Sequence, residues 1–379
     1  MQKIYLDYNA TTPIAPSVVE AMQPFLSTHY GNPSSSHSLG RVCHEAIVDA
    51  REKVAALLGA TPNEIVFTSS GTESNNLALK GVMMQQPLDM GGHLVISGFE
   101  HPAIEEPARY LQRLGYGLSI VPCSDEGEVQ PEAVEAAIRD DTLLVSIMHA
   151  NNEIGTLQPI RRIAEICKSH EVLLHTDASQ SIGKTRAFVD ELAVDLLTLA
   201  GHKLYAPKGI GALFVREGIA LEPFMHGAGH EAGLRAGTEN VPYIVALGEA
   251  AKLAFNGMDE NTDRMAMLRD RLLDHLSAGI GNKLTINGQH APRLPNTLSI
   301  NFPGVNGAEL LSRVPEICAS TGSACHSSSD ARSATLAAIG VNSQTAQGTV
   351  RLSVGWYTSE DDVDRAASLL IGAWEAMRP

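Results

Sequence analysis

The sequence predicts an α/β fold: a mostly parallel sheet of seven strands flanked by helices, with a second, smaller α/β unit attached. Three observations lead to this prediction. Short β-rich runs alternate with longer helical patterns, an order that places helices on both sides of a parallel sheet. Several of these runs are apolar throughout, which is typical of strands covered on both faces. The chain has 379 residues, enough for one large unit and a smaller one.

The predicted elements follow in a regular order along the chain. A helical stretch at 39–60, which Gly59 would close, precedes the first strand of the sheet. The runs predicted to form the large sheet are 64–70, 93–98, 118–122, 142–150, 171–177, 194–201 and 211–217. From about 241 to 278 the pattern is long and helical, and we expect one long helix there to join the two units. Strand patterns return at 294–304 and 348–358, and a C-terminal helix follows.

We place the boundary between the two units near residue 260. The large unit would span 16–260 and hold the ligand, and the small unit would combine 1–15 with 261–379. A loop of the small unit, at about 319–333, carries Cys325 within the polar stretch STGSACHSSSD. A cysteine is usually buried as a small apolar residue, so its place in an open, mobile loop predicts a chemical role.

Composition and charge exclude several classes of protein. The net charge is −15 and the pI is about 5.4, which argues against binding to nucleic acid or to an anionic membrane. No apolar run is long enough to span a membrane, and the first residues lack the apolar core of a secretory signal. The cysteines are few and scattered, which predicts a reducing cytoplasm and neither a disulfide framework nor a zinc site. They are Cys43, Cys123, Cys167, Cys318 and Cys325.

Polar side chains follow the predicted strands at the points where the strands end. In open α/β sheets, ligands bind beyond these carboxyl ends. The first strand of the sheet runs into Ser69, Ser70, Gly71, Thr72 and Glu73, and a helix follows. Small residues here let backbone N–H groups at the start of the helix approach a phosphate. The simpler interpretation is a helix cap formed by Ser70 or Thr72, and the pattern alone leaves both open.

Other strand ends carry single groups that are ambiguous when taken alone. Asp177 in HTDASQS could be only a helix cap, and His101 in GFEHPA could be a structural histidine. The segment MHANNEIG, at 148–155, adds two amides and a carboxylate that could form a turn network. Lys203 follows a strand and His202, in a turn bounded by glycines. A solvated loop lysine is the plain interpretation, but a desolvated amine becomes a nucleophile toward carbonyl groups.

Together, these strand ends would face one crevice of one sheet. They supply an amine, a carboxylate, an imidazole and a phosphate cradle. This set matches the needs of pyridoxal 5′-phosphate, which takes a Schiff-base lysine, an acidic partner for its pyridine nitrogen and an anchor for its phosphate. We therefore expect pyridoxal 5′-phosphate as the cofactor.

Ordered motifs along nearly the whole chain resemble one known family. They are YLDYNATTP (5–13), EIVFTSSGTESNNLALKG (64–81), SIMHANNEIG (146–155), HTDASQSIGK (175–184), GHKLYAPKGIGAL (201–213), MHGAGHEAGLRAGTEN (225–240), STGSACHS (320–327) and RLSVG (351–355). At these motifs the chain resembles the cysteine desulfurases, in the class V aminotransferase branch of the fold type I pyridoxal-phosphate enzymes. STGSAC in particular resembles the desulfurases that have a long mobile loop.

The resemblance implies a role for each matching residue around the cofactor ring. Lys203 resembles the lysine that holds the cofactor as a Schiff base, and Asp177 resembles the partner of the ring nitrogen. Gln180 resembles the contact to the ring hydroxyl oxygen. His101 resembles the residue stacked on the ring, and Asn152 matches a second residue of the cofactor and substrate pocket.

The resemblance also implies ligands for the phosphate and for the substrate. Gly71, Thr72 and His202 resemble phosphate ligands. Thr238 resembles a phosphate ligand supplied by the other subunit, which implies a homodimer. Arg351 resembles the clamp on the substrate carboxylate, a role suited to its planar fork of donors.

The implied reaction converts L-cysteine to L-alanine. Lys203 would move a proton from the substrate Cα, and the Cys325 thiolate would attack the substrate sulfur and keep it as a persulfide. The loop would then carry Cys325 to a sulfur-acceptor protein, for iron–sulfur cluster assembly or the synthesis of other thio-compounds. The implied catalytic residues are thus Cys325, Lys203 and His101. No resident metal is implied, although Cys325 is a candidate for transient ligation of an iron–sulfur cluster.

Departures from the family leave two other functions open. Ala200 stands where many relatives carry a serine, and His326 directly follows the cysteine, and both features resemble selenocysteine lyases. The segment after Cys325 and the short C-terminus also differ from housekeeping desulfurases, which puts docking of an iron–sulfur scaffold in doubt. A selenocysteine lyase, acting on L-selenocysteine, is therefore the first alternative. A catalytically silent binding partner is the second, although the residues implied for catalysis are all present.

Overall fold

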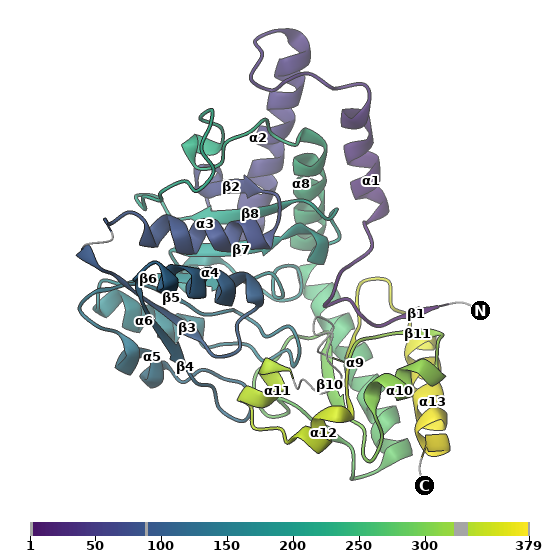
Figure 1. Ribbon diagram of the computed structural model, residues 1–379. Coiled ribbons are helices and arrows are strands. Elements are labelled where there is room, and N and C mark those ends of the chain that lie inside the picture. Colours follow the sequence, from purple (N-terminus) through teal and green to yellow (C-terminus); the bar gives the residue numbers. More distant parts are fainter. Residues whose placement is uncertain (1–2, 88–89, 322–332, 378–379) are drawn as a thin grey trace.

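The core of the fold is a seven-stranded sheet with the strand order β2-β8-β7-β6-β5-β3-β4 (Figure 1). The computed structural model describes residues 3–87, 90–321 and 333–377. The strands are β2 (Ile65–Thr68), β3 (His93–Ser97), β4 (Gly117–Val121), β5 (Thr142–Ser146), β6 (Leu173–Asp177), β7 (Leu196–Ala200) and β8 (Gly211–Val215). Neighbouring strands pair in parallel except at β8, which is antiparallel to both β2 and β7. The predicted mostly parallel sheet is confirmed.

Helices cover both faces of this sheet, as predicted. They are α1 (Pro16–Met22), α2 (Ser38–Leu58), α3 (Gly71–Met83), α4 (Pro102–Arg113), α5 (Pro131–Ala137), α6 (Ile160–Ser169), α7 (Val189–Leu192) and α8 (Val241–Asn256). On one face α3 and α4 share a core with Leu94 and Ile96 of β3, and on the other α2, α6 and α8 share a core with Val95. Successive side chains of a strand point to opposite faces, which explains why this strand is apolar throughout. Gly59 closes α2 as predicted, with a left-handed φ of 66°.

Six of the seven predicted strand runs are shorter in the structure, and the run 118–122 is displaced by one residue, to 117–121. Two of them show the difference most clearly. The run 142–150 forms a strand only as far as Ser146, and its later residues Met148 and Ala150 line a cavity beside the sheet. The run 171–177 forms a strand from Leu173 onward. At 142–150 the apolar pattern extends beyond the paired residues, because the loop after β5 is buried as well.

A second hydrophobic core contains elements from both ends of the chain. Its elements are β1 (Ile4–Tyr5), α9 (Met258–Ile280), β9 (Thr285–Ile286), β10 (Thr297–Asn301), α10 (Gly307–Arg313), β11 (Ile317–Cys318), β12 (Thr349–Ser353) and α13 (Glu360–Met377). The strands form an antiparallel sheet, β12-β10-β9, and a parallel pair, β1-β11. Ile4 and Leu6 pack in this core, whereas Tyr8 and Ala15 pack in the first one. The division at 16–260 stays a prediction.

The prediction of one long helix over 241–278 is wrong. The chain forms two helices, α8 and α9, which are separated at Gly257. The Gly257 N–H donates to the Leu253 carbonyl oxygen and closes α8. The two helices belong to different cores, since α8 packs against α2 and α9 packs against α13. No helix within the described ranges is long and apolar enough to cross a membrane.

Candidate active site

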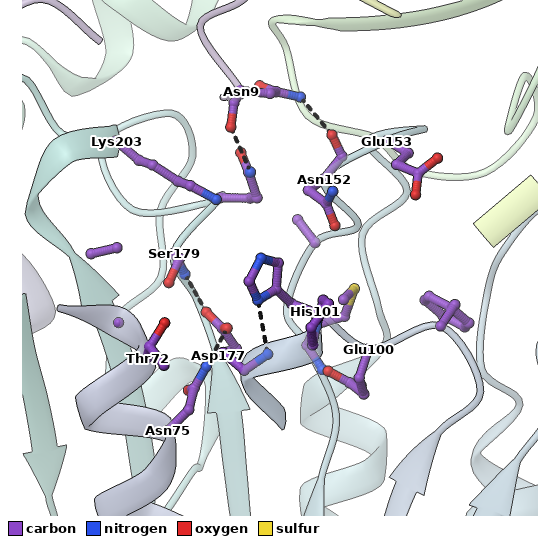
Figure 2. Close-up of a pocket in the computed structure, with 18 of the residues that line it drawn as sticks. Asn9, Thr72, Asn75, Glu100, His101, Asn152, Glu153, Asp177, Ser179 and Lys203 are labelled. Carbon is purple, nitrogen blue, oxygen red and sulfur yellow. Dashed lines mark hydrogen bonds between the residues drawn. The ribbon is translucent and has the colours of Figure 1, made fainter. Parts of the chain in front are cut away.

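A cavity of about 490 Å³ opens at the carboxyl ends of the strands, a size typical of small-molecule sites. Loops that follow β2, β3, β5, β6 and β7 line it, as expected for an open α/β sheet. Asn9, Arg351 and the start of α11 (Ala334–Ala338) complete its wall. The cavity thus combines residues from both ends of the chain, and Figure 2 shows how they surround it.

The start of α3 offers backbone donors to the cavity. Ser70 caps the helix, because its side chain accepts a hydrogen bond from an N–H of the first turn. The N–H groups of Gly71 and Thr72 come before the first intrahelical bond and lack a partner within the helix. A Cβ at Gly71 would lie 3.1 Å from Ser179 Oγ and 3.2 Å from Ala200 Cβ, so a larger residue would crowd both loops. This arrangement suits an anion such as a phosphate.

Asp177 is a buried carboxylate at the end of β6. Its Oδ1 accepts a hydrogen bond from the Ser179 N–H at 2.9 Å, and its Oδ2 accepts one from Asn75 Nδ2 at 2.8 Å. Burial by itself raises the pKa of Asp177, but these hydrogen bonds outweigh it, so the pKa lies below its ordinary value. The cavity therefore contains an ionised carboxylate that is held in one orientation.

Lys203 lies in the turn that directly follows β7, and its side chain points into the cavity (Figure 2). Burial lowers the pKa of Lys203 to about 8; the charge of Asp177 opposes this effect and that of Arg351 adds to it. Near pH 8 about half of the amine is thus unprotonated, far more than in an ordinary lysine. This is the form that attacks a carbonyl group.

Two histidines of the cavity are neutral. His101 caps α4, because its Nδ1 accepts a hydrogen bond from the Ala103 N–H at 3.0 Å, which leaves the proton on Nε2. Burial lowers the pKa of His101, and the charge of Lys203 adds to this effect. Burial also lowers the pKa of His202 to about 4, and its Nδ1 lies 3.2 Å from Thr11 Oγ1. Both rings can stack or hydrogen-bond without carrying charge.

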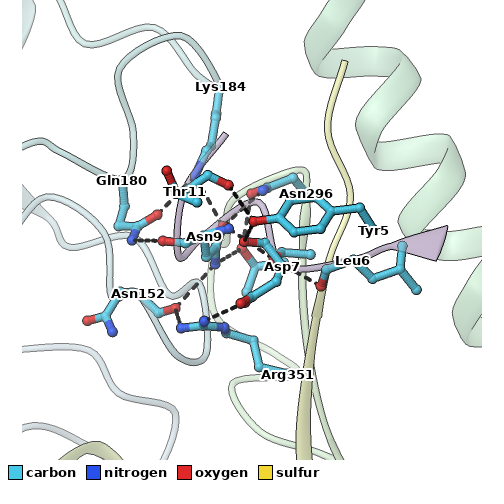
Figure 3. A network of polar contacts seen from close by, with 12 residues as sticks. Tyr5, Leu6, Asp7, Asn9, Thr11, Asn152, Gln180, Lys184, Asn296 and Arg351 are labelled. Atoms are coloured by element: carbon cyan, nitrogen blue, oxygen red, sulfur yellow. Dashed lines mark hydrogen bonds and ion pairs between the residues drawn. The ribbon is translucent and has the colours of Figure 1, made fainter. Parts of the chain in front are cut away.

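Arg351 reaches the cavity from β12. Its Nη1 donates to the Asn152 carbonyl oxygen at 3.0 Å, and its Nη2 pairs with Asp7 Oδ1 at 2.8 Å (Figure 3). The side chain is only 6% exposed, and its Nε has no hydrogen-bond partner among the described residues. Because a buried donor without a partner costs free energy, this N–H favours a carboxylate that enters the cavity.

Most of the predicted site residues line this one cavity. They are Gly71, Thr72, His101, Asn152, Asp177, Gln180, His202, Lys203 and Arg351. Thr238 is not among them, since it is exposed in the loop before α8. Cys325 and His326 lie outside the described residues, as does most of the predicted loop at 319–333. The roles assigned to these residues stay predictions.

Sequence reasoning misses three residues that support the site. Asn75, which holds Asp177, lies one helical turn after Gly71, and this spacing is a usable signal. Asp7 gives no such signal, because the arginine that it pairs with lies near the other end of the chain. Lys184 is buried and hydrogen-bonds to Gln180, but nothing in the sequence indicates that this lysine is buried.

The donor set of the cavity fits pyridoxal 5′-phosphate. Lys203 offers an amine with a lowered pKa, and Asp177 offers an ionised carboxylate. The start of α3 offers a cradle for the phosphate, and His101 offers a neutral ring. The fold and this cavity together define a pyridoxal-phosphate-dependent enzyme.

Residues 4–366 match the family model described as aminotransferase class-V. The chain belongs to this family, and within it to the cysteine desulfurases. A cysteine desulfurase IscS from Dictyoglomus turgidum is 44% identical over 379 residues, which cover 100% of this chain and 96% of that protein. Cysteine desulfurase IscS 1 from Archaeoglobus fulgidus is 42% identical over 376 residues, which cover 99% of this chain and 97% of that protein.

Solved structures agree with this assignment. A NifS-like protein superposes with a TM-score of 0.90 at 36% identity and covers 99% of both chains. SspA, solved in complex with cysteine, has a TM-score of 0.85 at 37% identity and covers 94% of this chain and 100% of that one. The expected fold class, enzyme class and pyridoxal-phosphate cofactor are thereby confirmed.

Proposed function

We propose that this enzyme converts L-cysteine to L-alanine and keeps the sulfur on Cys325 as a persulfide. One observation carries the proposal: an amine, an ionised carboxylate and a buried guanidinium with a free N–H face a single cavity. These groups belong to Lys203, Asp177 and Arg351. When bound, pyridoxal phosphate supplies an electron sink for the charge that develops at the substrate Cα.

The residues around the cofactor ring have distinct tasks. Lys203 would hold the cofactor covalently, and its amine would move the substrate Cα proton. Asp177 would keep the pyridine nitrogen protonated, because its own pKa is lowered and it stays ionised. His101 would stack on the ring as a neutral imidazole, and Gln180 would donate to the ring hydroxyl oxygen.

The substrate carboxylate binds to Arg351 through its free Nε. Asp7 and the Asn152 carbonyl oxygen hold the other two nitrogens of the guanidinium at 2.8 and 3.0 Å. This fixes the plane of the fork before the substrate arrives, so that less conformational entropy is lost on binding. The Asn152 side chain completes the pocket for the cofactor and substrate.

The sulfur moves in one displacement. The Cys325 thiolate attacks the substrate sulfur, a new S–S bond forms and the substrate C–S bond breaks. The electron pair of the broken bond stays with the carbon fragment, which leaves as alanine after protonation. Cys325 then carries a persulfide that it transfers to an acceptor protein in the cytoplasm, for iron–sulfur cluster assembly or other thio-compounds.

A homodimer completes the phosphate site. Gly71, Thr72 and His202 come from one subunit, and Thr238 comes from the other. The exposure of Thr238 outside the cavity of its own chain supports this arrangement. A group of exposed apolar side chains near the N-terminus also supports a homodimer, because such groups are typical of interaction surfaces. They are Ile14, Val19, Leu26, Tyr30, Leu39 and Val42.

The proposal is tested by mass spectrometry and by alanine formation. After incubation with cysteine, the wild-type enzyme should gain the mass of one sulfur atom on the peptide that contains Cys325. Cys325→Ala should lose both this mass gain and alanine formation, yet still bind the cofactor. Cys318→Ala, which removes a thiol from β11 outside the cavity, should behave as wild type. Lys203→Ala should lose the absorbance of the covalently bound cofactor.

Selenocysteine serves as the second substrate in the same assay. A wild-type enzyme that makes neither alanine nor persulfide from cysteine, but does turn over selenocysteine, would contradict the proposal and favour the lyase. Ala200 lies in the cavity wall, and an alanine at this position resembles the selenocysteine lyases, so this alternative is included in the assay.

A further inference from the structure

Lys184 is a buried lysine that the proposed reaction does not use. It lies in the turn after β6 and is 5% exposed. Its Nζ donates to Gln180 Oε1 at 2.9 Å and to Asn9 Oδ1 at 3.1 Å (Figure 3). Within the described part of the chain, no carboxylate forms an ion pair with it. Because a buried lysine without a counterion is costly, its presence beside the cavity needs an explanation.

The hydrogen bonds around Gln180 fix how its amide is turned. Gln180 Nε2 donates to the Asn9 carbonyl oxygen at 3.0 Å, and a carbonyl oxygen can only accept. The amide oxygen must therefore face Lys184, whose Nζ donates to it. A primary amide has two N–H hydrogens, so one remains free of these contacts. Gln180 lines the cavity, which makes this second N–H a donor toward the site.

Asn9 is held by the same amine. Its Oδ1 accepts from Lys184 at 3.1 Å and from Asn296 Nδ2 at 2.9 Å, and its Nδ2 donates to Thr297 Oγ1 at 2.8 Å. Lys184 thus holds Gln180 in two ways. It donates directly to the amide oxygen of Gln180, and it also holds Asn9, whose carbonyl oxygen accepts from the amide nitrogen of Gln180. Two N–H groups are enough for both contacts, so the arrangement does not depend on whether the amine is protonated.

We propose that Lys184 is a positioning residue of the cofactor site, which anchors the Gln180 amide so that its free N–H points at the ring hydroxyl oxygen of pyridoxal phosphate. This inference rests on the proposed function. A donor at that oxygen favours its anionic form, and this lowers the pH at which the bound chromophore loses its proton. Lys184 should therefore influence a spectroscopic midpoint without touching the cofactor.

The test is a pH titration of the cofactor absorbance in holoenzyme variants. Lys184→Met keeps an unbranched side chain, one atom shorter than that of lysine, but removes the donor, and Gln180→Leu removes the amide itself. The double variant combines them, and Lys168→Met, an exposed lysine of α6, is the matched control. The other charged or titratable groups of the cavity stay unchanged in every variant: Lys203, Asp177, His101, His202, Arg351, Glu100, Glu105, Glu106 and Glu153.

Lys184→Met and Gln180→Leu should each raise the midpoint, by about half to one pH unit for the loss of one hydrogen bond. The double variant should shift no further than the larger single shift, because both changes remove the same interaction. Lys168→Met should titrate as wild type. In Lys184→Gln the side chain is one bond too short to reach Gln180 Oε1 and Asn9 Oδ1, so its midpoint should shift as in Lys184→Met. This variant replaces Lys184→Met if the methionine variant does not fold.

Three results would count against these claims in different ways. An unshifted midpoint in the Lys184 variants contradicts the inference. Shifts that add fully in the double variant also contradict it, because Lys184 would then act independently of Gln180. A wild-type protein that takes up no pyridoxal phosphate contradicts the proposed function, and the inference with it.

Discussion

Asp177→Asn is the substitution that tests the cofactor site most directly. It changes one oxygen into an NH2 group and keeps the size and shape of the side chain. Both carboxylate oxygens of Asp177 accept hydrogen bonds, from the Ser179 N–H and from Asn75 Nδ2. An asparagine has a single amide oxygen, so one of these two donors must face its NH2 group. The variant therefore loses a charged hydrogen bond as well as the negative charge.

The expected effect on cofactor binding follows from this geometry. A hydrogen bond to a charged group contributes about 1.5–3 kcal/mol. With the cofactor bound, the carboxylate would pair with the protonated ring nitrogen, and the same range applies to this hydrogen bond, which the variant cannot form. Since each 1.4 kcal/mol is about a factor of ten, the Kd for pyridoxal phosphate should rise by roughly 10- to 150-fold. The rate of alanine formation should fall further, because the electron sink is weakened as well.

The assay is a titration of the apoenzyme with pyridoxal phosphate, followed by absorbance, with circular dichroism as the check on folding. Asp195→Asn is the matched control. Asp195 accepts the Leu174 N–H at 2.8 Å through Oδ2, but it directly precedes β7 and so lies at the amino end of that strand, away from the cavity. This control should bind the cofactor as wild type does. A wild-type Kd together with normal alanine formation in Asp177→Asn would show that the carboxylate is only a turn-forming group.

Two further predictions follow from other groups of the cavity. Cofactor uptake by the apoenzyme should accelerate as the pH rises through about 8, the pKa of Lys203, because only the neutral amine attacks the aldehyde. The rate is measured by stopped-flow absorbance. A rate that does not change between about pH 7 and 9 would argue against Lys203 as the residue that binds the cofactor. Arg351→Gln should raise KM for cysteine by roughly 10- to 150-fold, because one charge-assisted hydrogen bond is removed, with a smaller change in kcat. Steady-state alanine formation measures both constants, and an unchanged KM would remove Arg351 from the substrate site.

The functional groups at the carboxyl ends of the strands are predictable because the sequence signals for them are local. Asp177, His101 and Lys203 each follow an apolar run directly, and the ends of parallel strands converge on one crevice. The sequence alone also leaves ambiguities that the structure resolves. Ser70 rather than Thr72 caps α3, and His101 is a helix cap as well as part of the cavity wall. A capping role and a site role are thus compatible.

Other features are not predictable because they depend on packing between distant segments. The break at Gly257 carries only a weak signal, since a single glycine is tolerated in a helix at modest cost. It becomes decisive only because α8 and α9 belong to different cores. The partner of Asp177 on α3, Asn75, can be expected from helix spacing only once the two elements are known to be neighbours.

The ion pair between Arg351 and Asp7 shows why the substrate side of the cavity is the hardest part to predict. Arg351 lies on β12, and Asp7 follows β1, which pairs in parallel with β11. Their ion pair forms only because the first residues of the chain return to the C-terminal core, where Ile4 and Leu6 are fully buried. From there the chain passes Asn9, which hydrogen-bonds to Lys184 and Thr297. The N-terminal segment therefore connects the cofactor side of the cavity to the substrate side, and a disturbance of either side should affect both.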